Sequence, residues 1–91
     1  MLRLFQLRSQ ERYQQAVNLL RRAAYRQDLT YDQRERFSFE LGVLLQTRLA
    51  DTAAACAHWQ EHRSRFAVDH RRDRIAEFEE ACVGLQPSDR E

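Results

Sequence analysis

Apolar residues recur every three or four positions along most of the chain, which is the spacing of one face of an α-helix. The clearest stretch runs from Phe37 to Phe66, where two such stripes flank a short polar turn at Arg48–Asp51. The stripes consist of Phe37, Leu41, Leu44 and Leu45, and of Ala55, Trp59, His62 and Phe66. This pattern predicts two helices that fold back on each other across the turn.

Capping signals set the bounds of four predicted helices. Thr30 with Gln33 matches a capping box at the start of the second helix, and Asp51 is suited to cap the third. Asp69 is placed to cap the fourth helix, and Gly84 to end it in a left-handed conformation before a proline. The expected helices cover residues 2–27, 31–48, 52–65 and 70–83.

The predicted fold class is all-α. The chain has only two glycines and one proline, so strands joined by tight turns are not expected, and short connections make sequential helices antiparallel. We predict four antiparallel helices in one domain over residues 1–86, with a polar tail over 87–91. Gly42 lies within a helix, which costs stability unless a neighbouring helix approaches closely, and Ala55 and Trp59 are expected at that crossing.

Two segments share a spacing of three, four and three residues: Tyr13, Ala16, Leu20 and Ala23, and Thr52, Ala55, Trp59 and His62. This spacing resembles the second helix of a tetratricopeptide (TPR) unit, and Leu41–Gly42 with Leu45 resembles its first helix. The resemblance covers roughly residues 10–66 and implies a TPR-like array of helical hairpins that holds other proteins. The alternative is a plain four-helix bundle.

The second helix carries a further apolar stripe, Phe39 and Val43, opposite its Leu41 and Leu45 side. First-type helices of TPR-like arrays line a concave groove, so the resemblance implies a partner-binding surface on this helix. Its expected members are Arg36, Phe39, Val43 and Gln46. In the alternative interpretation, Phe39 and Val43 pack on the first and fourth helices, because a central helix is buried on several sides.

The charges of the chain are balanced. There are 15 basic and 14 acidic residues, so the formal net charge of +1 gives no global field that would attract nucleic acid or an anionic membrane. No stretch approaches the roughly 18 apolar residues that span a bilayer. Every basic residue is arginine, a bias typical of a GC-rich bacterial genome.

Three of these arginines lie close together in the fourth predicted helix. Arg71 and Arg74, with Arg72, could clamp carboxylates or phosphates as secondary polar contacts. The alternative is a solvated face, on which the arginines pair with Asp73, Glu77 and Glu79. A small arginine-dependent nucleic-acid-binding or regulatory protein is the alternative function, although the balanced charge makes nucleic acid the weaker choice of partner.

The stretch from His58 to His62 matches the H-x-x-E-H string of inverted zinc peptidases. Catalysis would also need a third protein ligand and a substrate cleft, which so small a core does not offer. We therefore predict no catalytic residue, no metal and no cofactor, and a protein that is not an enzyme. His62 is expected at the edge of the core and His58 in solvent.

The only two cysteines, Cys56 and Cys82, lie on inward faces of adjacent predicted helices. A disulfide between them is geometrically conceivable and would indicate an oxidising compartment. We favour two buried, reduced thiols, and we expect a cytoplasmic protein. The alternative is the periplasm, if the chain is a fragment or the mature form of an exported protein.

These observations together predict a protein–protein interaction module. We expect it to bind a peptide or helix of a partner protein, as an adaptor, a chaperone-like holder or an assembly domain of a larger complex. Self-association is a further expectation, because an array with few repeats buries its open face against a copy, and the amphipathic segment Leu2–Leu7 could supply that contact.

Overall fold

The computed structural model of the protein describes residues 2–67 and 70–85, with side chains over 10–67 and 70–83. These residues form helices and turns only, which confirms the all-α prediction. None of the helices described is both long and apolar enough to cross a membrane. The elements are α1 (Leu2–Ala23), α2 (Tyr31–Val43), a π-helix η1 (Leu44–Arg48), α3 (Thr52–Arg65), α4 (Arg72–Glu79) and a 3-10 helix η2 (Glu80–Leu85).

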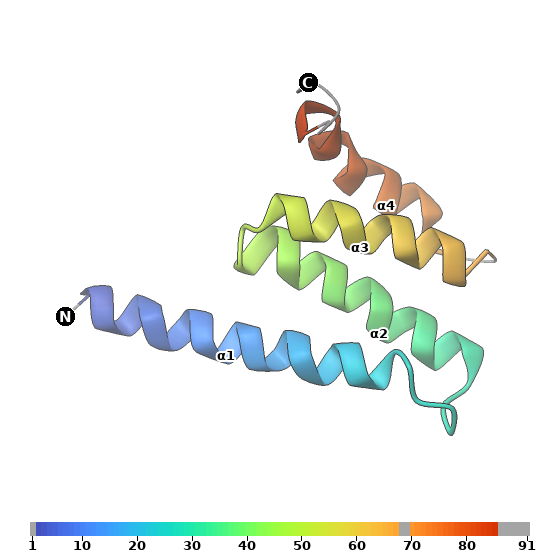
Figure 1. Cartoon of the computed structure of the whole chain (residues 1–91), viewed down its shortest axis with the longest axis horizontal. Helices are drawn as coiled ribbons and strands as arrows, with labels where there is room; N and C mark the ends of the chain where they lie inside the picture. The colour runs from blue at the N-terminus through green and yellow to red at the C-terminus, as the bar shows by residue number, and fades with distance from the viewer. Residues whose placement is uncertain (1, 68–69, 86–91) are drawn as a thin grey trace.

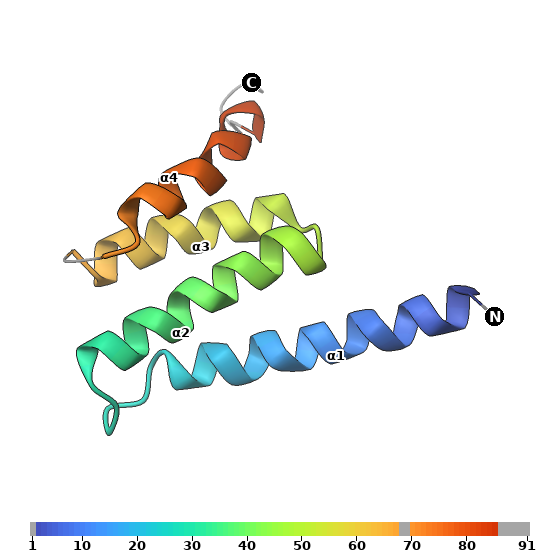
Figure 2. The ribbon, with the colours of Figure 1, turned by 180° about the vertical axis from the view of Figure 1, so that it is seen from behind.

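The helices form an open row in which the chain direction alternates (Figures 1 and 2). Helix α1 packs on α2 and η1, α2 packs on α3, and α3 packs on α4 and η2. Helices α1 and α4 therefore lie at opposite ends of the row, with α2 and α3 between them. This order follows from the short connections, because a helix joined by a short loop can only return beside its predecessor.

The predicted caps of the two central helices are confirmed. The Gln33 amide N–H donates to Thr30 Oγ1 at 3.1 Å, and Gln33 Oε1 accepts from the Thr30 amide at 2.9 Å, which completes the capping box. The Ala54 amide donates to the Asp51 carboxylate at 3.1 Å. Both caps satisfy backbone donors that a helix start leaves without partners, so α2 and α3 begin where the sequence places them.

The predicted end of the first helix and both predicted ends of the fourth are wrong. Helix α1 ends at Ala23 instead of Gln27, because the amides of Tyr25 and Arg26 turn to the carbonyls three residues back, at 3.1 and 3.2 Å. Helix α4 begins at Arg72, and the predicted cap Asp69 lies outside the described residues. Gly84 lies within η2 and does not follow the helix, because the chain tightens to 3-10 geometry after Glu79.

The core consists of two clusters. Helices α1, α2 and α3 with η1 bury Val17, Leu41, Leu45 and Ala55, while α2, α3 and α4 bury Phe39, Trp59 and Ile75. Trp59 and Ala55 are fully buried, and a Cβ atom added at Gly42 would lie 2.6 Å from Cζ2 and Cζ3 of the indole. The predicted close crossing of α2 and α3 at Gly42 is therefore confirmed, and the indole fills it.

Candidate functional site

A groove crosses the face of α2 between α1 and α4. It has a volume of about 350 Å³. Its lining residues come from four elements: Leu20 from α1, Phe39, Glu40 and Val43 from α2, Leu44 from η1 and Arg74 from α4. We call this the α2 groove. It brings together three of the residues that the sequence singled out, Phe39, Val43 and Arg74, and it does not include Arg36, Gln46 or Arg71.

Phe39 belongs to the core as well as to the groove. Only 6% of its surface is exposed, and its ring centroid lies 5.9 Å from that of Trp59 and 6.4 Å from that of Phe78. The alternative interpretation of the sequence, in which Phe39 packs on the fourth helix, describes this residue better than an exposed anchor does. Val43 and Leu44 are half-buried and offer more of their surface to the groove.

Gln46 does not face the groove, because both ends of its side chain are bonded inside the protein. Its Nε2 donates to the carbonyl of Phe78 at 2.8 Å, and its Oε1 accepts from Nε1 of Trp59 at 2.9 Å. The amide thus satisfies the only polar atom of a buried indole and ties α3 to α4. The prediction that Gln46 contacts a partner is therefore not supported by its position.

The arginines where α3 and α4 approach α2 differ in their partners. Arg71 forms an ion pair with Glu35, a carboxylate only 3% exposed, while Arg63 of α3 donates to Glu79 at 2.7 and 2.9 Å. The Arg74 guanidinium lies over the ring of Phe39, with Cζ 5.3 Å from the centroid. The expected solvated face, on which these arginines pair within α4, is thus wrong for Arg71 and Glu79, because both find partners on neighbouring helices.

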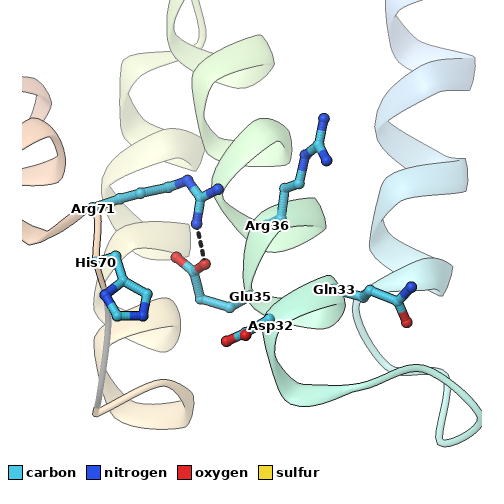
Figure 3. A pocket seen from close by; sticks show the side chains of 6 residues that line it. All are labelled: Asp32, Gln33, Glu35, Arg36, His70 and Arg71. Atoms are coloured by element: carbon cyan, nitrogen blue, oxygen red, sulfur yellow. Dashed lines mark hydrogen bonds and ion pairs between the residues drawn. The ribbon is translucent and has the colours of Figure 1, made fainter.

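A second depression of about 500 Å³ lies where α2 begins and α4 approaches it, lined by Asp32, Gln33, Glu35, Arg36, His70 and Arg71. Figure 3 shows the Glu35 carboxylate directed at Arg71, while the Arg36 guanidinium points away from that pair. Arg36 pairs instead with Glu40 at 3.2 Å. Since both guanidinium groups are neutralised by carboxylates, this depression offers a ligand little net charge.

A buried polar network joins α2 to α3, and the sequence analysis missed it. Ser38 Oγ lies 2.7 Å from Nδ1 of His62 and 3.1 Å from Nε2 of His58. His62 Nε2 lies 3.5 Å from Glu35 Oε2. The only local signal was Ser38 standing between two phenylalanines, which places a polar side chain near an apolar face.

The serine, histidine and carboxylate of this network follow the order of groups in a hydrolytic triad. Ser38 is 1% exposed and His62 0%, so a substrate has no path to the hydroxyl. The network gives the buried Ser38 hydroxyl and Nδ1 of His62 hydrogen-bond partners and positions α2 against α3. His62 was expected at the edge of the core, but it is fully buried. Burial is possible there because Ser38 and Glu35 lie next to its two ring nitrogens.

His58 also differs from expectation. It is half-buried instead of solvated, and its Nε2–H donates to the Ser38 carbonyl at 2.7 Å. The pKa of His58 is lowered to about 4, mainly by burial. The nearby His62, Arg21 and Arg65 act in the same direction, and the hydrogen bond to Ser38 opposes them. His58 is therefore neutral at neutral pH. Within the described part of the chain, no three metal-ligating side chains lie close enough to hold an ion.

The two cysteines form a disulfide, which overturns the expectation of reduced thiols. Cys56 of α3 and Cys82 of η2 have Cα atoms 5.8 Å apart. This separation falls within the usual range for a disulfide because η2 turns back along α3. The bond fastens the last described element of the chain to the middle of the row.

Comparison with known proteins adds no further constraint: the chain matches no protein-family model, no curated protein and no solved structure.

Proposed function

We propose that the protein is an interaction module that binds a peptide or helix of a partner protein in the α2 groove, as an adaptor, a chaperone-like holder or an assembly domain. One observation carries the proposal: the apolar face of α2 is flanked by Leu20 of α1 and Leu44 of η1, with Arg74 of α4 beside it, and is left open between α1 and α4. Leu20, Val43 and Leu44 there can bury one or two side chains of an amphipathic segment.

The row of antiparallel helices supports a TPR-like arrangement as part of the same proposal. A first-type helix, α2, forms the floor of the groove, and the small residues Gly42 and Ala55 lie at its crossing with α3. The alternative function of nucleic-acid binding loses one of its residues, because Arg71 is committed to a buried carboxylate. We therefore retain the peptide-binding function alone.

The disulfide bears on the compartment in which the module works. Disulfides persist in oxidising environments and are rare in the cytosol of mesophiles. The bond between Cys56 and Cys82 therefore favours the periplasm over the cytoplasm, and we propose that the partner is met there.

A peptide selection tests the function. A random peptide library displayed on phage is selected on the immobilised, oxidised protein, and the recovered peptides are synthesised and titrated by fluorescence anisotropy. The substitution Val43→Gln should weaken their binding by about tenfold, equal to ~1.4 kcal/mol, because it places an uncompensated amide in the apolar groove.

Ala57→Gln is the matched control, since Ala57 is exposed on α3, which does not line the groove. Binding to this variant should equal that of the unsubstituted protein, and circular dichroism should show both variants folded. If the library yields no binder, or only peptides that bind the Val43→Gln variant as well as the original, the protein does not use this groove.

A further inference from the structure

We infer that the segment bound in the α2 groove carries an aspartate or glutamate beside its apolar anchor, and that Arg74 selects this carboxylate. The inference rests on the proposed function and names the chemical class of the partner: an acidic, amphipathic segment of another protein. It is carried by the position of Arg74 over the ring of Phe39 and by the ion pairs of the neighbouring arginines.

The three arginines Arg36, Arg71 and Arg74 differ in whether a carboxylate neutralises them. Arg71 pairs with Glu35, and Arg36 pairs with Glu40. Among the described residues, no carboxylate forms an ion pair with Arg74, whose recorded contact is the ring of Phe39. The groove therefore presents one unneutralised positive group beside its apolar surface, and a carboxylate on the partner would balance it.

The position of Arg74 is also held before any partner arrives. Its neighbour Ile75 is fully buried in the core cluster of Trp59, which fixes this turn of α4. The ring of Phe39, itself buried, lies beneath the guanidinium at a distance typical of cation–π contact. Part of the entropy cost of ordering a long side chain is thus met in the free protein, which favours recognition of a carboxylate at a defined place.

The N-terminal segment of a second copy is a poor occupant of the same groove. The segment Leu2–Leu7, with the residues around it up to Gln10, contains Arg3 and Arg8 and no acidic residue. Docking this segment beside Arg74 would bring like charges together, which is unfavourable. An acidic segment from a different protein avoids that repulsion.

A nucleic acid would also satisfy a guanidinium, but the groove favours a side chain. Single-stranded nucleic acids are held by a row of basic groups that follows the backbone. Here the Arg74 guanidinium, which has no carboxylate partner among the described residues, lies over the ring of Phe39. The groove is otherwise lined by apolar residues such as Val43 and Leu44, which can bury an apolar side chain but do not bind phosphate. Nucleic-acid binding is therefore an outcome that the experiment must exclude.

The test uses the peptides selected above on the oxidised protein. We expect acidic residues to be enriched within one helical turn of the apolar anchor. Replacing that Glu by Gln in a synthetic peptide should weaken binding to the unsubstituted protein by about three- to fivefold, the range of a partly exposed ion pair. The same replacement should have no effect on binding to the Arg74→Gln variant.

A charge reversal sharpens the result. The Arg74→Glu variant should prefer the peptide in which Lys replaces Glu, whereas Arg72→Glu, the same change at an exposed residue of α4 that does not line the groove, should keep the original preference. Arg74 is exposed, so its variants should fold, and circular dichroism verifies this.

The outcomes separate this inference from the proposed function. Peptides that depend on Val43 but bind equally well with Glu, Gln or Lys overturn the role of Arg74 and leave the groove function standing. Binding of a mixed-sequence RNA oligonucleotide that is lost in Arg74→Gln but unchanged in Val43→Gln overturns the acidic partner. A library without groove-dependent peptides overturns both proposals.

Discussion

At the scale of single residues, Trp59 contacts more elements of the structure than the sequence pattern indicated. Its indole lies against the backbone at Gly42, stacks on Phe78 with centroids 5.7 Å apart and donates to Gln46. It therefore contacts α2, η1 and α4 from α3. A side chain bound on so many sides cannot shift without breaking other contacts, which is the general property of close-packed interiors.

Gly42→Ala should destabilise the protein. In an open helix this change stabilises by about 1 kcal/mol, because alanine is the better helix former. Here the added methyl group would meet the indole, and overpacking of this kind costs about 1–3 kcal/mol. We expect a lower midpoint in urea denaturation with an unchanged slope. Combining it with Trp59→Phe should cost less than the sum of the two changes, and a stabilised single variant would refute the contact.

Protonation of His58 should make the free energy of unfolding depend on pH. Its pKa is about 4 in the folded protein and near 6.5 when unfolded, so the unfolded chain binds the proton first as the pH falls. The free energy of unfolding is therefore highest, as far as His58 is concerned, above pH 6.5. It should fall by up to about 3 kcal/mol as the pH decreases from 6.5 towards 4. Urea denaturation at stepped pH values measures it.

The control for this pH dependence is His58→Gln, which should flatten the stability profile between pH 6.5 and 4. A histidine resonance that titrates near 6.5 in the folded protein and disappears in His58→Gln would show that His58 is solvated after all.

At the scale of elements, α4 and η2 depend on contacts with α3 more than on their own length. Helix α4 has only eight residues, too short to be stable alone in water. It is held by the buried Ile75, by Phe78 against Trp59, by the Arg63–Glu79 pair and by the disulfide after it. Because Arg74 of α4 forms one wall of the α2 groove, these contacts also position the proposed site.

Reducing the Cys56–Cys82 disulfide should lower the free energy of unfolding by roughly 3–4 kcal/mol, because the bond closes a loop with a sequence separation of 26 and restricts the unfolded chain. Urea denaturation with and without dithiothreitol measures this difference. The double variant Cys56→Ala, Cys82→Ala should be insensitive to the reductant. Two free thiols detected by a thiol reagent in the oxidised, denatured protein would show that the bond is absent.

At the scale of the whole molecule, the row of helices leaves more surface open than a closed bundle would. The Cα radius of gyration is 14.3 Å, whereas about 12 Å is typical of a compact domain of this length. The additional extent comes from helices laid side by side without closure between α1 and α4. The α2 groove exists because of this openness, since its walls are the two helices that do not meet.

The parts of the fold that were predicted correctly depend on residues close together in the chain. The Thr30 and Asp51 caps and the helical stripes were visible because each signal spans only a few positions. Gly42 was informative because glycine lowers the stability of a helix, and this loss is offset where another helix approaches closely. Of the residues predicted for a binding site, Val43 and Arg74 line the groove, whereas Gln46 and Arg71 find partners inside the protein.

Periodicity and capping thus established an all-α chain, because helix formation is governed by neighbours three or four residues away. The glycine within a helix indicated the close approach of α2 and α3 at Gly42. The partners of polar side chains were settled by packing. Glu35 meets Arg71, Ser38 meets His62 and Cys56 meets Cys82, all more than 20 residues apart in sequence. These pairings leave Arg74, among the arginines near Phe39, without a carboxylate partner in the described part of the chain. They depend on how α4 is placed against α2 and α3.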